Sequence, residues 1–303
     1  MTASVTVLGE ALIDIVVTPA GEVTEHVGGS PANVAVGTAR LGHATSLVTH
    51  IGTDERGKRI AGLMANEKVL LGPGSIWAHH TSTATARLDA AGVASYDFDL
   101  EWRIDATESL LPGAHLHTGS IAAVLPPGAA AVRHLIETAR PNSTLSYDPN
   151  VRPSLMGELG AAREAVEGMV ALADIVKASE EDLAWLYPDG SVHGVLRAWA
   201  GLGPRLCVAT RGGGPVIALM AGQIHDVAVR SVPVIDTVGA GDSFMAGLIS
   251  GLLDAGLVGG PDARARLYAA TWQHIAPAVQ RAIDCSAITV GRSGANPPTR
   301  AEL

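Results

Sequence analysis

The sequence DTVGAGDSF, residues 236–244, runs from a loop of small residues directly into an amphipathic helical pattern. Glycines leave backbone N–H groups uncovered, and the start of a helix carries a partial positive charge, so the stretch favours an anion site. Asp242 stands at the helix start, where a carboxylate can accept a proton from an attacking hydroxyl. Aspartate also caps helices at such positions. The spacing alone leaves both interpretations of Asp242 open.

Around this stretch, short apolar segments alternate with amphipathic ones, which predicts an α/β fold with a mainly parallel sheet and helices on both faces. Strands are expected at 4–8, 45–51, 143–147, 174–177 and 205–210, and a hairpin at 215–229. Helices are expected at 31–42, 54–67, 126–140, 160–172, 240–256 and 261–278.

A second hairpin is expected at 81–104, with Asp89-Ala90-Ala91-Gly92 as its turn. Its second arm alternates between polar residues and the apolar Ala94, Tyr96, Phe98, Leu100 and Trp102. Such alternation is typical of a sheet with one wet face. We therefore expect a single domain over 1–303, with a small β-sheet built from residues near 12–28 and 80–104.

Composition narrows the classes of partner. The 303 residues are 47% hydrophobic and carry a formal net charge of −9. An acidic chain argues against nucleic acid or an anionic membrane as the main partner. The two cysteines, Cys207 and Cys285, show no disulfide or metal spacing, and the N-terminus has no secretory pattern. A cytoplasmic protein is expected.

The stretch 236–244 resembles the C-terminal signature of the ribokinase-like (PfkB) carbohydrate kinase family, and GGSPAN at 28–33 resembles its N-terminal signature. The similarity extends to GEALID at 9–14, IGTD at 51–54, SYDPNVRP at 146–153 and GANPP at 294–298. Two signatures in this order are more specific than either one. The resemblance implies a ribokinase-like three-layer fold whose small β-sheet acts as a lid, with ATP and Mg²⁺ bound.

The resemblance also implies roles for individual residues at the sugar and the transferring phosphate. Asp242 is expected to be the catalytic base, and the backbone amides of Gly239, Ala240 and Gly241 to hold the phosphate. Asp14, Gly28, Gly29 and Asn33 are expected to bind the sugar. A turn for Asp14 and a helix cap for Asn33 are the alternatives.

Arg152 lies in the run DPNVR that follows an apolar strand. Polar groups at the carboxyl end of a parallel strand usually face the ligand crevice, so Arg152 is expected to contact substrate or phosphate. The alternative is a polar turn formed by Asp148 and Asn150 before Pro153.

The nucleotide and metal ions are expected at three further strand ends or loops. Lys177, Ser179, Thr210, Gly212, Gly239 and Gly241 are expected on the nucleotide side. Many relatives have Asn-x-x-Glu where this chain has Ser179 and Asp182, so Asp182 is expected to hold Mg²⁺ through water. A capping box is the alternative for this pair, as a plain hairpin turn is for Thr210 and Gly212. Asp236 is implied to bind a monovalent cation such as K⁺.

Residues 52–59, GTDERGKR, nearly match a P-loop but end on Arg59 in place of a hydroxyl residue, so a polar turn entering a helix is the better interpretation. The pairs His79/His80 and His115/His117 are interpreted as ordinary loop or strand residues rather than a zinc site.

The expected reaction is ATP-dependent conversion of D-fructose to fructose 6-phosphate. The alternatives are 2-keto-3-deoxygluconate kinase, ribokinase, nucleoside kinase, or a non-catalytic sugar- or nucleotide-binding protein. A homodimer through the lid is also expected.

Overall fold

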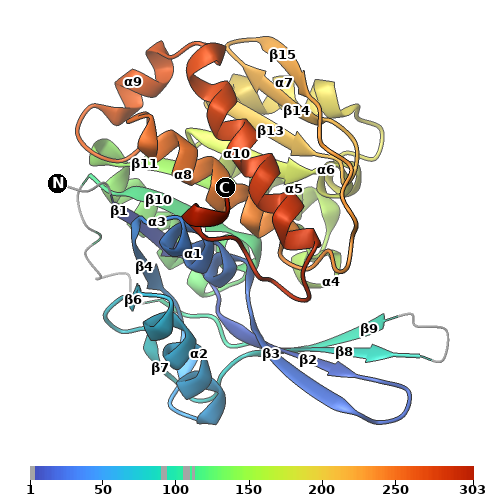
Figure 1. The fold of residues 1–303 in the computed structure, drawn as a ribbon. Helices are drawn as coiled ribbons and strands as arrows, with labels where there is room; N and C mark the ends of the chain where they lie inside the picture. The colour runs from blue at the N-terminus through green and yellow to red at the C-terminus, as the bar shows by residue number, and fades with distance from the viewer. Residues whose placement is uncertain (1–3, 90–93, 105–109, 111–112) are drawn as a thin grey trace.

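The computed structural model describes residues 4–89, 94–104, 110 and 113–303 (Figure 1). A nine-stranded sheet forms its middle layer, in the order β15-β14-β13-β12-β11-β10-β1-β4-β6. Its strands are parallel except for the antiparallel hairpin of β14 and β15 at one edge. The bounds are β1 Ser4–Leu8, β4 Ala44–Val48, β6 Val69–Leu71, β10 His115–Gly119, β11 Thr144–Asp148, β12 Ile175–Ser179, β13 Leu206–Thr210, β14 Val216–Met220 and β15 Gln223–Val227. The mainly parallel α/β sheet is confirmed.

Helices cover both faces of this sheet, which confirms the three layers (Figure 1). Helices α1, α8 and α10 pack on one face, and α3, α5, α6 and α7 on the other. The helices are α1 Ser30–Arg40, α2 Glu55–Asn66, α3 Gly128–Ala139, α4 Pro153–Met156, α5 Leu159–Val170, α6 Glu180–Leu186, α7 Val192–Leu202, α8 Ala240–Asp254, α9 Ala263–Ala269 and α10 Trp272–Val290.

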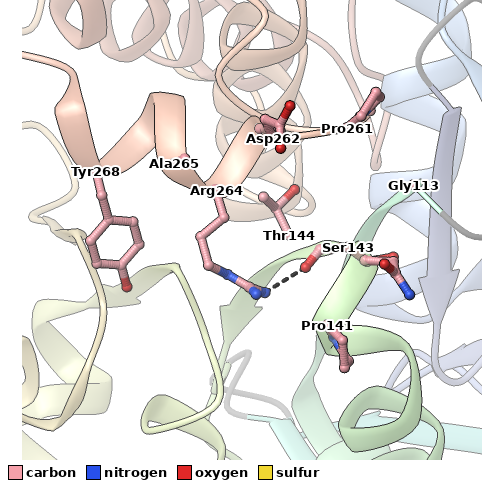
Figure 2. Close-up of a pocket in the computed structure, with 12 residues that line it drawn as sticks. Gly113, Pro141, Ser143, Thr144, Pro261, Asp262, Arg264, Ala265 and Tyr268 are labelled. Atoms are coloured by element: carbon pink, nitrogen blue, oxygen red, sulfur yellow. Dashed lines mark hydrogen bonds between the residues drawn. The ribbon is translucent and has the colours of Figure 1, made fainter.

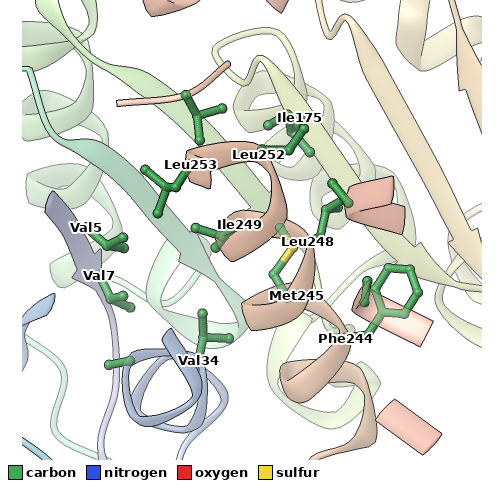
Figure 3. Packing of buried hydrophobic residues seen from close by; sticks show 14 of the residues in the cluster. Val5, Val7, Val34, Ile175, Phe244, Met245, Leu248, Ile249, Leu252 and Leu253 are labelled. Carbon is green, nitrogen blue, oxygen red and sulfur yellow. The ribbon is translucent and has the colours of Figure 1, made fainter. Parts of the chain in front are cut away.

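Helix α8 is buried along almost its whole length. Its side chains from position 242 to position 253 are all buried, and Figure 3 shows Leu248 and Ile249 in the cluster that contains Val5 and Val7 of β1. Neighbouring Leu8 belongs to the cluster on the opposite face, as the alternation of a strand requires. This packing fixes the start of α8, and with it Asp242, against the core.

The second sheet has the order β3-β2-β8-β9 and projects from the body of the molecule (Figure 1). We call it the lid sheet, made of β2 Leu12–Val17, β3 Val23–Gly28, β8 Thr83–Leu88 and β9 Ala94–Asp99. Both hairpin pairs are antiparallel, and β2 joins β8 in parallel. These strands lie in the two expected segments, whereas residues 90–92 of the expected turn 89–92 lie outside the described residues.

Trp102 was expected on the apolar face of the hairpin, and this is wrong. Its side chain is 3% exposed and belongs to the cluster under α3. The indole N–H donates to the carbonyl of Ala122 at 3.1 Å. Tyr96, on the same expected face, is 64% exposed. The alternating pattern therefore spans two environments. Tyr96 lies on the lid sheet, whereas Trp102 lies in the core, because the chain leaves the lid sheet after Asp99.

Some boundaries also differ from expectation. The helix expected over 261–278 is two helices, because Ala270 is extended and Thr271 starts α10 with a capping box. Strand β10 was not predicted. His115 and His117 lie in it, buried and hydrogen-bonded to Thr144 and Ser146, which confirms that they are ordinary strand residues. The small pair β5 Ile51–Gly52 and β7 Ile76–Ala78 was not predicted as a separate sheet.

Candidate active site

Asp242 is held by two side chains from the start of α1. Its Oδ1 accepts a hydrogen bond from Ser30 Oγ at 2.6 Å, and its Oδ2 accepts one from Asn33 Nδ2 at 2.8 Å. The N-cap of α8 is Gly239, without a side-chain capping bond, so the capping interpretation of Asp242 is wrong. The N-cap of α1 is Gly29, so Asn33 is not a cap either. The carboxylate is thus fixed in one orientation next to the predicted anion loop.

The loop before α8 has the geometry of an anion site. Gly239 has φ of 73°, in the left-handed region, and a side chain there would lie 2.6 Å from Ala295 Cβ. The first N–H groups of a helix lack partners within the helix and point outward. One predicted member is engaged elsewhere, because the Ala240 N–H donates to Thr237 O at 3.2 Å. Gly239 and Gly241 are the better candidates for binding phosphate.

The Lys177 ammonium lies next to Gly241 at the end of this loop. It is 2.8 Å from Asp148 Oδ2, and both side chains are buried. A Cβ on Gly241 would lie 2.9 Å from Lys177 Nζ. Burial alone lowers the pKa of Lys177, but the charges of Asp148, Asp182 and Asp242 outweigh it and raise that pKa above its usual value. The ammonium therefore stays charged.

Asp14 lies on the lid strand β2, and its carboxylate sits over Gly28 of β3. A Cβ on Gly28 would lie 1.9 Å from Asp14 Oδ2, so any larger residue here would displace the Asp14 carboxylate. Gly29 has φ of 102°, and a Cβ there would lie 2.5 Å from the carbonyl oxygen of Glu10. Burial raises the pKa of Asp14 to about 6, and the charge of Asp242 adds to this effect. The predicted sugar residues of the lid thus lie near the predicted base.

Arg152 faces the same region. Its charge lowers the pKa of Asp14 and of Glu10, although burial raises both overall. Its Nη1 also donates to Asn150 Oδ1 at 2.9 Å. The Asn150 N–H donates to Asp148 Oδ1 at 3.1 Å, so the polar turn proposed as an alternative is present. That turn does not exclude a ligand role, because the side chain of Arg152 remains exposed.

Ser179 and Asp182 form the capping box that was the alternative to a magnesium site. Asp182 Oδ2 accepts from the Ser179 N–H, and Oδ1 accepts from the Val151 N–H, both at 2.8 Å. Asp182 is also buried. The structure therefore gives both carboxylate oxygens backbone partners, and the magnesium role of Asp182 stays a prediction.

The remaining predicted residues line neighbouring strand ends. Thr210 pairs in register with Ser179, and Gly212 lies in the turn between β13 and β14, where Gly214 N–H donates to Arg211 O. The hairpin is thus confirmed, and the nucleotide role of Thr210 and Gly212 stays a prediction. Asp236 accepts from the Val238 and Gly294 N–H groups, which lower its pKa and tie the loop to the C-terminal tail.

Two residues of the site were missed from the sequence. Ser30 was seen only as part of a motif, although it donates to Asp242. Glu10 is buried beside Ser120, and its Oε2 has no hydrogen-bond partner among the described residues. Burial raises the pKa of Glu10 to about 8. Its signals in the sequence were its place two residues after a buried strand and its membership of the stretch GEALID at 9–14.

A cavity of about 710 Å³ lies elsewhere, between α9 and the amino ends of β10 and β11 (Figure 2). Its main cation, Arg264, is already paired with buried Asp174 and the carbonyl of Ser143. We place the active site at the opposite, carboxyl edge of the sheet, where the unusual carboxyl and ammonium groups gather.

Within the described part of the chain, no group of three or more His, Cys, Asp or Glu side chains is arranged to hold a metal ion. None of the helices in that part is long and apolar enough to cross a membrane.

The sequence model of the family described as "pfkB family carbohydrate kinase" matches residues 2–302 of this chain. A fructokinase of Klebsiella pneumoniae is 34% identical, over 97% of this chain and 95% of its own, and one of Escherichia coli is 33% identical over 85% and 87%.

Solved structures are similar over nearly the whole chain. Fructokinase from Vibrio cholerae O395, in a fructose, ADP and calcium ion bound form, has a TM-score of 0.83 at 27% identity, covering 97% of this chain and 94% of that one. An uncharacterized sugar kinase from Pyrococcus horikoshii in complex with ATP has a TM-score of 0.80 at 25% identity, covering 99% and 96%. With both signatures and the sheet architecture in place, the chain belongs to the pfkB family of carbohydrate kinases and is an ATP-dependent sugar kinase.

Proposed function

We propose that this sugar kinase is a fructokinase, which converts D-fructose and ATP to fructose 6-phosphate and ADP. The observation that carries the proposal is the Asp242 carboxylate, held by Ser30 and Asn33 at the start of α8 beside the Gly-Ala-Gly loop. The substrate rests on the similarity to fructokinases from several bacteria, at up to 34% identity.

In this proposal, Asp242 accepts the proton of the sugar hydroxyl as its oxygen bonds to the γ-phosphorus. The bond from that phosphorus to the bridging oxygen of ATP breaks, and ADP leaves with the electron pair. Charge on the transferring group is stabilised by the N–H groups of Gly239 and Gly241 and by the start of α8. The hydrogen bonds from Ser30 and Asn33 hold the Asp242 carboxylate in one orientation, and a fixed orientation of the base favours proton transfer.

The sugar is proposed to lie between Asp242 and the lid, against Asp14, Gly28, Gly29 and Asn33. A carboxylate accepts hydrogen bonds from several hydroxyls, and the two glycines allow the sugar to approach the backbone. Arg152 is positioned to contact sugar or phosphate. Closure of the lid sheet would exclude water, which otherwise competes as the phosphoryl acceptor.

The nucleotide is proposed to lie across the ends of β12 and β13, near Ser179, Thr210 and Gly212. Mg²⁺ would arrive with ATP, because the described residues form no preformed cage and this ion keeps several waters. No step is assigned to it. A fructokinase double mutant from Vibrio cholerae O395 has been solved in a potassium ion bound form, which supports K⁺ as a ligand of this chain, and we propose Asp236 as its site.

We also propose that the lid can pair with a second copy of the chain. Tyr96 is 64% exposed and stacks on Phe98 with ring centroids 6.1 Å apart, and Val23 of β3 is 59% exposed. Pairing of two lids would cover these apolar side chains.

The test of the substrate is a coupled ADP-release assay with ketoses, pentoses, sugar acids and nucleosides, followed by identification of the product. We expect the highest kcat/KM with D-fructose and a phosphate on its 6-hydroxyl. A higher value with 2-keto-3-deoxygluconate, ribose or a nucleoside would replace the fructokinase proposal by the corresponding kinase. ADP release with none of them would favour a non-catalytic binding protein.

A further inference from the structure

The ion pair between Lys177 and Asp148 lies in an unusual place for a buried pair. The two side chains come from the adjacent strands β12 and β11, and they are 4% and 2% exposed. The ammonium packs against the backbone of Gly241, in the first turn of α8, because only the missing Cβ leaves room for it. Among the described residues, Asp148 is the only hydrogen-bond partner of Lys177 Nζ, so the other N–H groups of the ammonium remain available.

A cation is disfavoured at the start of a helix, where the helix already carries partial positive charge. The fold nevertheless places a full charge there and surrounds it with Asp148, Asp182 and Asp242. The three carboxylates keep the ammonium charged, and its contact with Gly241 places this positive charge at the loop that precedes α8. The ammonium is stabilised further when an anion binds at that loop. Phosphoryl transfer requires such stabilisation of negative charge on the transferring group.

We propose that Lys177 is a catalytic cation for phosphoryl transfer, reaching the transferring group past Gly241, and that Asp148 is a positioning residue that holds its ammonium there. The inference rests on the proposed roles of Asp242 and of the loop 239–241. It does not depend on which sugar is the substrate.

The competing view is that the pair only stabilises the fold. Removing one partner of a buried ion pair leaves an uncompensated charge and destabilises a protein strongly, whereas removing both charges with similar volumes is often neutral. Lys177→Met keeps most of the side-chain volume. Asp148→Asn keeps the acceptor for the Asn150 N–H and removes only the charge. The double variant therefore separates stability from catalysis.

We would measure melting temperature and kcat for Lys177→Met, Asp148→Asn and the double variant, at saturating ATP and with the sugar that the wild-type chain uses best. We expect both single variants to melt at lower temperature and the double variant to regain most of that loss. The kcat of the double variant stays roughly 10²–10³-fold below wild type, the loss typical of one removed charge-stabilising donor. Recovery of kcat along with stability would overturn the proposal.

Gly241→Ala provides a second test that needs no buried charge to be removed. Among the described residues, Lys177 Nζ is the only neighbour within 4 Å of the added Cβ, so the substitution displaces the ammonium and little else. We expect kcat to fall at least tenfold in the chain with Lys177 and by less than threefold when the same change is made in the Lys177→Met background. Equal losses in both backgrounds, or an unchanged kcat in the first, would contradict the role of Lys177.

Because all variants are compared with the sugar found for wild type, failure of the fructose assignment leaves this test intact. Failure of the base assignment would show instead as full activity of an Asp242→Asn variant with intact Lys177.

Discussion

The central sheet and the lid sheet differ in how their strands are covered. All five residues of β10, of β11 and of β14 are buried, whereas only one of the six residues of β3 and the first two of β2 are buried. Strands buried on both faces unfold only with the whole domain, whereas a sheet covered on one side has fewer contacts to lose. Asp148 and Lys177 come from the central sheet and Asp242 from the buried helix α8 packed on it, whereas Asp14 and Gly28 come from the lid sheet.

This division suits a kinase. Groups that stabilise a transition state must be held rigidly, since small displacements reduce the rate strongly. Groups that only bind the sugar can lie on an element that moves to admit it. Substitutions in the central region should therefore lower kcat, and substitutions in the lid should mainly raise KM for the sugar.

The largest effect is expected for Asp242→Asn in the central region. The amide keeps the size of the carboxylate but cannot accept the proton, so kcat should fall by roughly 10²–10⁴-fold. Steady-state ADP release would measure it, with binding of ATP as the control for an intact fold. A fall of less than threefold would mean that another group is the base.

The next effect is expected at the junction of the two regions. In Gly28→Ala the added methyl group collides with the Asp14 carboxylate, which must move away from the sugar. Losing a hydrogen bond to a charged group costs about 1.5–3 kcal/mol, so KM for the sugar should rise roughly 10- to 100-fold. Gly21→Ala, in the turn between β2 and β3 with no atom within 4 Å of the new Cβ, is a control for general disturbance of the lid. Equal KM values in the two variants would remove Asp14 from the sugar site.

A smaller effect is expected from pH. Burial raises the pKa of Asp14 to about 6, so the carboxylate form that accepts hydrogen bonds is lost below that pH. The KM for the sugar should rise about tenfold per pH unit below pH 6, and Asp14→Asn should remove this dependence. Folding favours the protonated form, so the stability this group contributes is full below pH 3.8 and is lost as pH rises through about 6. A pH-independent KM in the wild-type chain would contradict the role of Asp14.

The smallest effect is expected on the outer surface of the lid. Tyr96→Ser should change the free energy of unfolding of a single chain by less than about 0.5 kcal/mol, because the ring is mostly exposed. Trp199→Ala, at a side chain with 0% exposure in the core, should cost about 3–5 kcal/mol. Chemical denaturation would compare the two. If Tyr96→Ser also lowers the association constant of the chain in sedimentation experiments, the lid pairs with a second copy.

Much of the architecture followed from sequence patterns. The alternation of apolar strands and amphipathic helices predicted the three layers, and the two signatures predicted that Asn33 and Asp242 act at one site. Their side chains, 209 positions apart, do form a hydrogen bond. Glycine and proline around the start of α1 and glycine before α8 gave those helix starts clear local signals.

The features that escaped prediction depend on packing between distant segments. Trp102 continues an alternating pattern, yet its ring lies against Gly128 in the core. The position of Lys177 under Gly241 depends on how β12 meets α8, which no local pattern describes. Ser179 and Asp182 fit two interpretations equally well, and only the positions of the Ser179 and Val151 N–H groups distinguish a capping box.

The division of roles between the core and the lid sheet can be tested directly by the kinetics of two variants. The kcat and the KM for the sugar of Asp242→Asn and Asp14→Asn would be determined side by side with the best sugar substrate at saturating ATP. We predict that Asp242→Asn loses kcat with little change in KM, and that Asp14→Asn raises KM at least tenfold while keeping most of kcat. The account would be contradicted if both variants changed the same constant by similar factors.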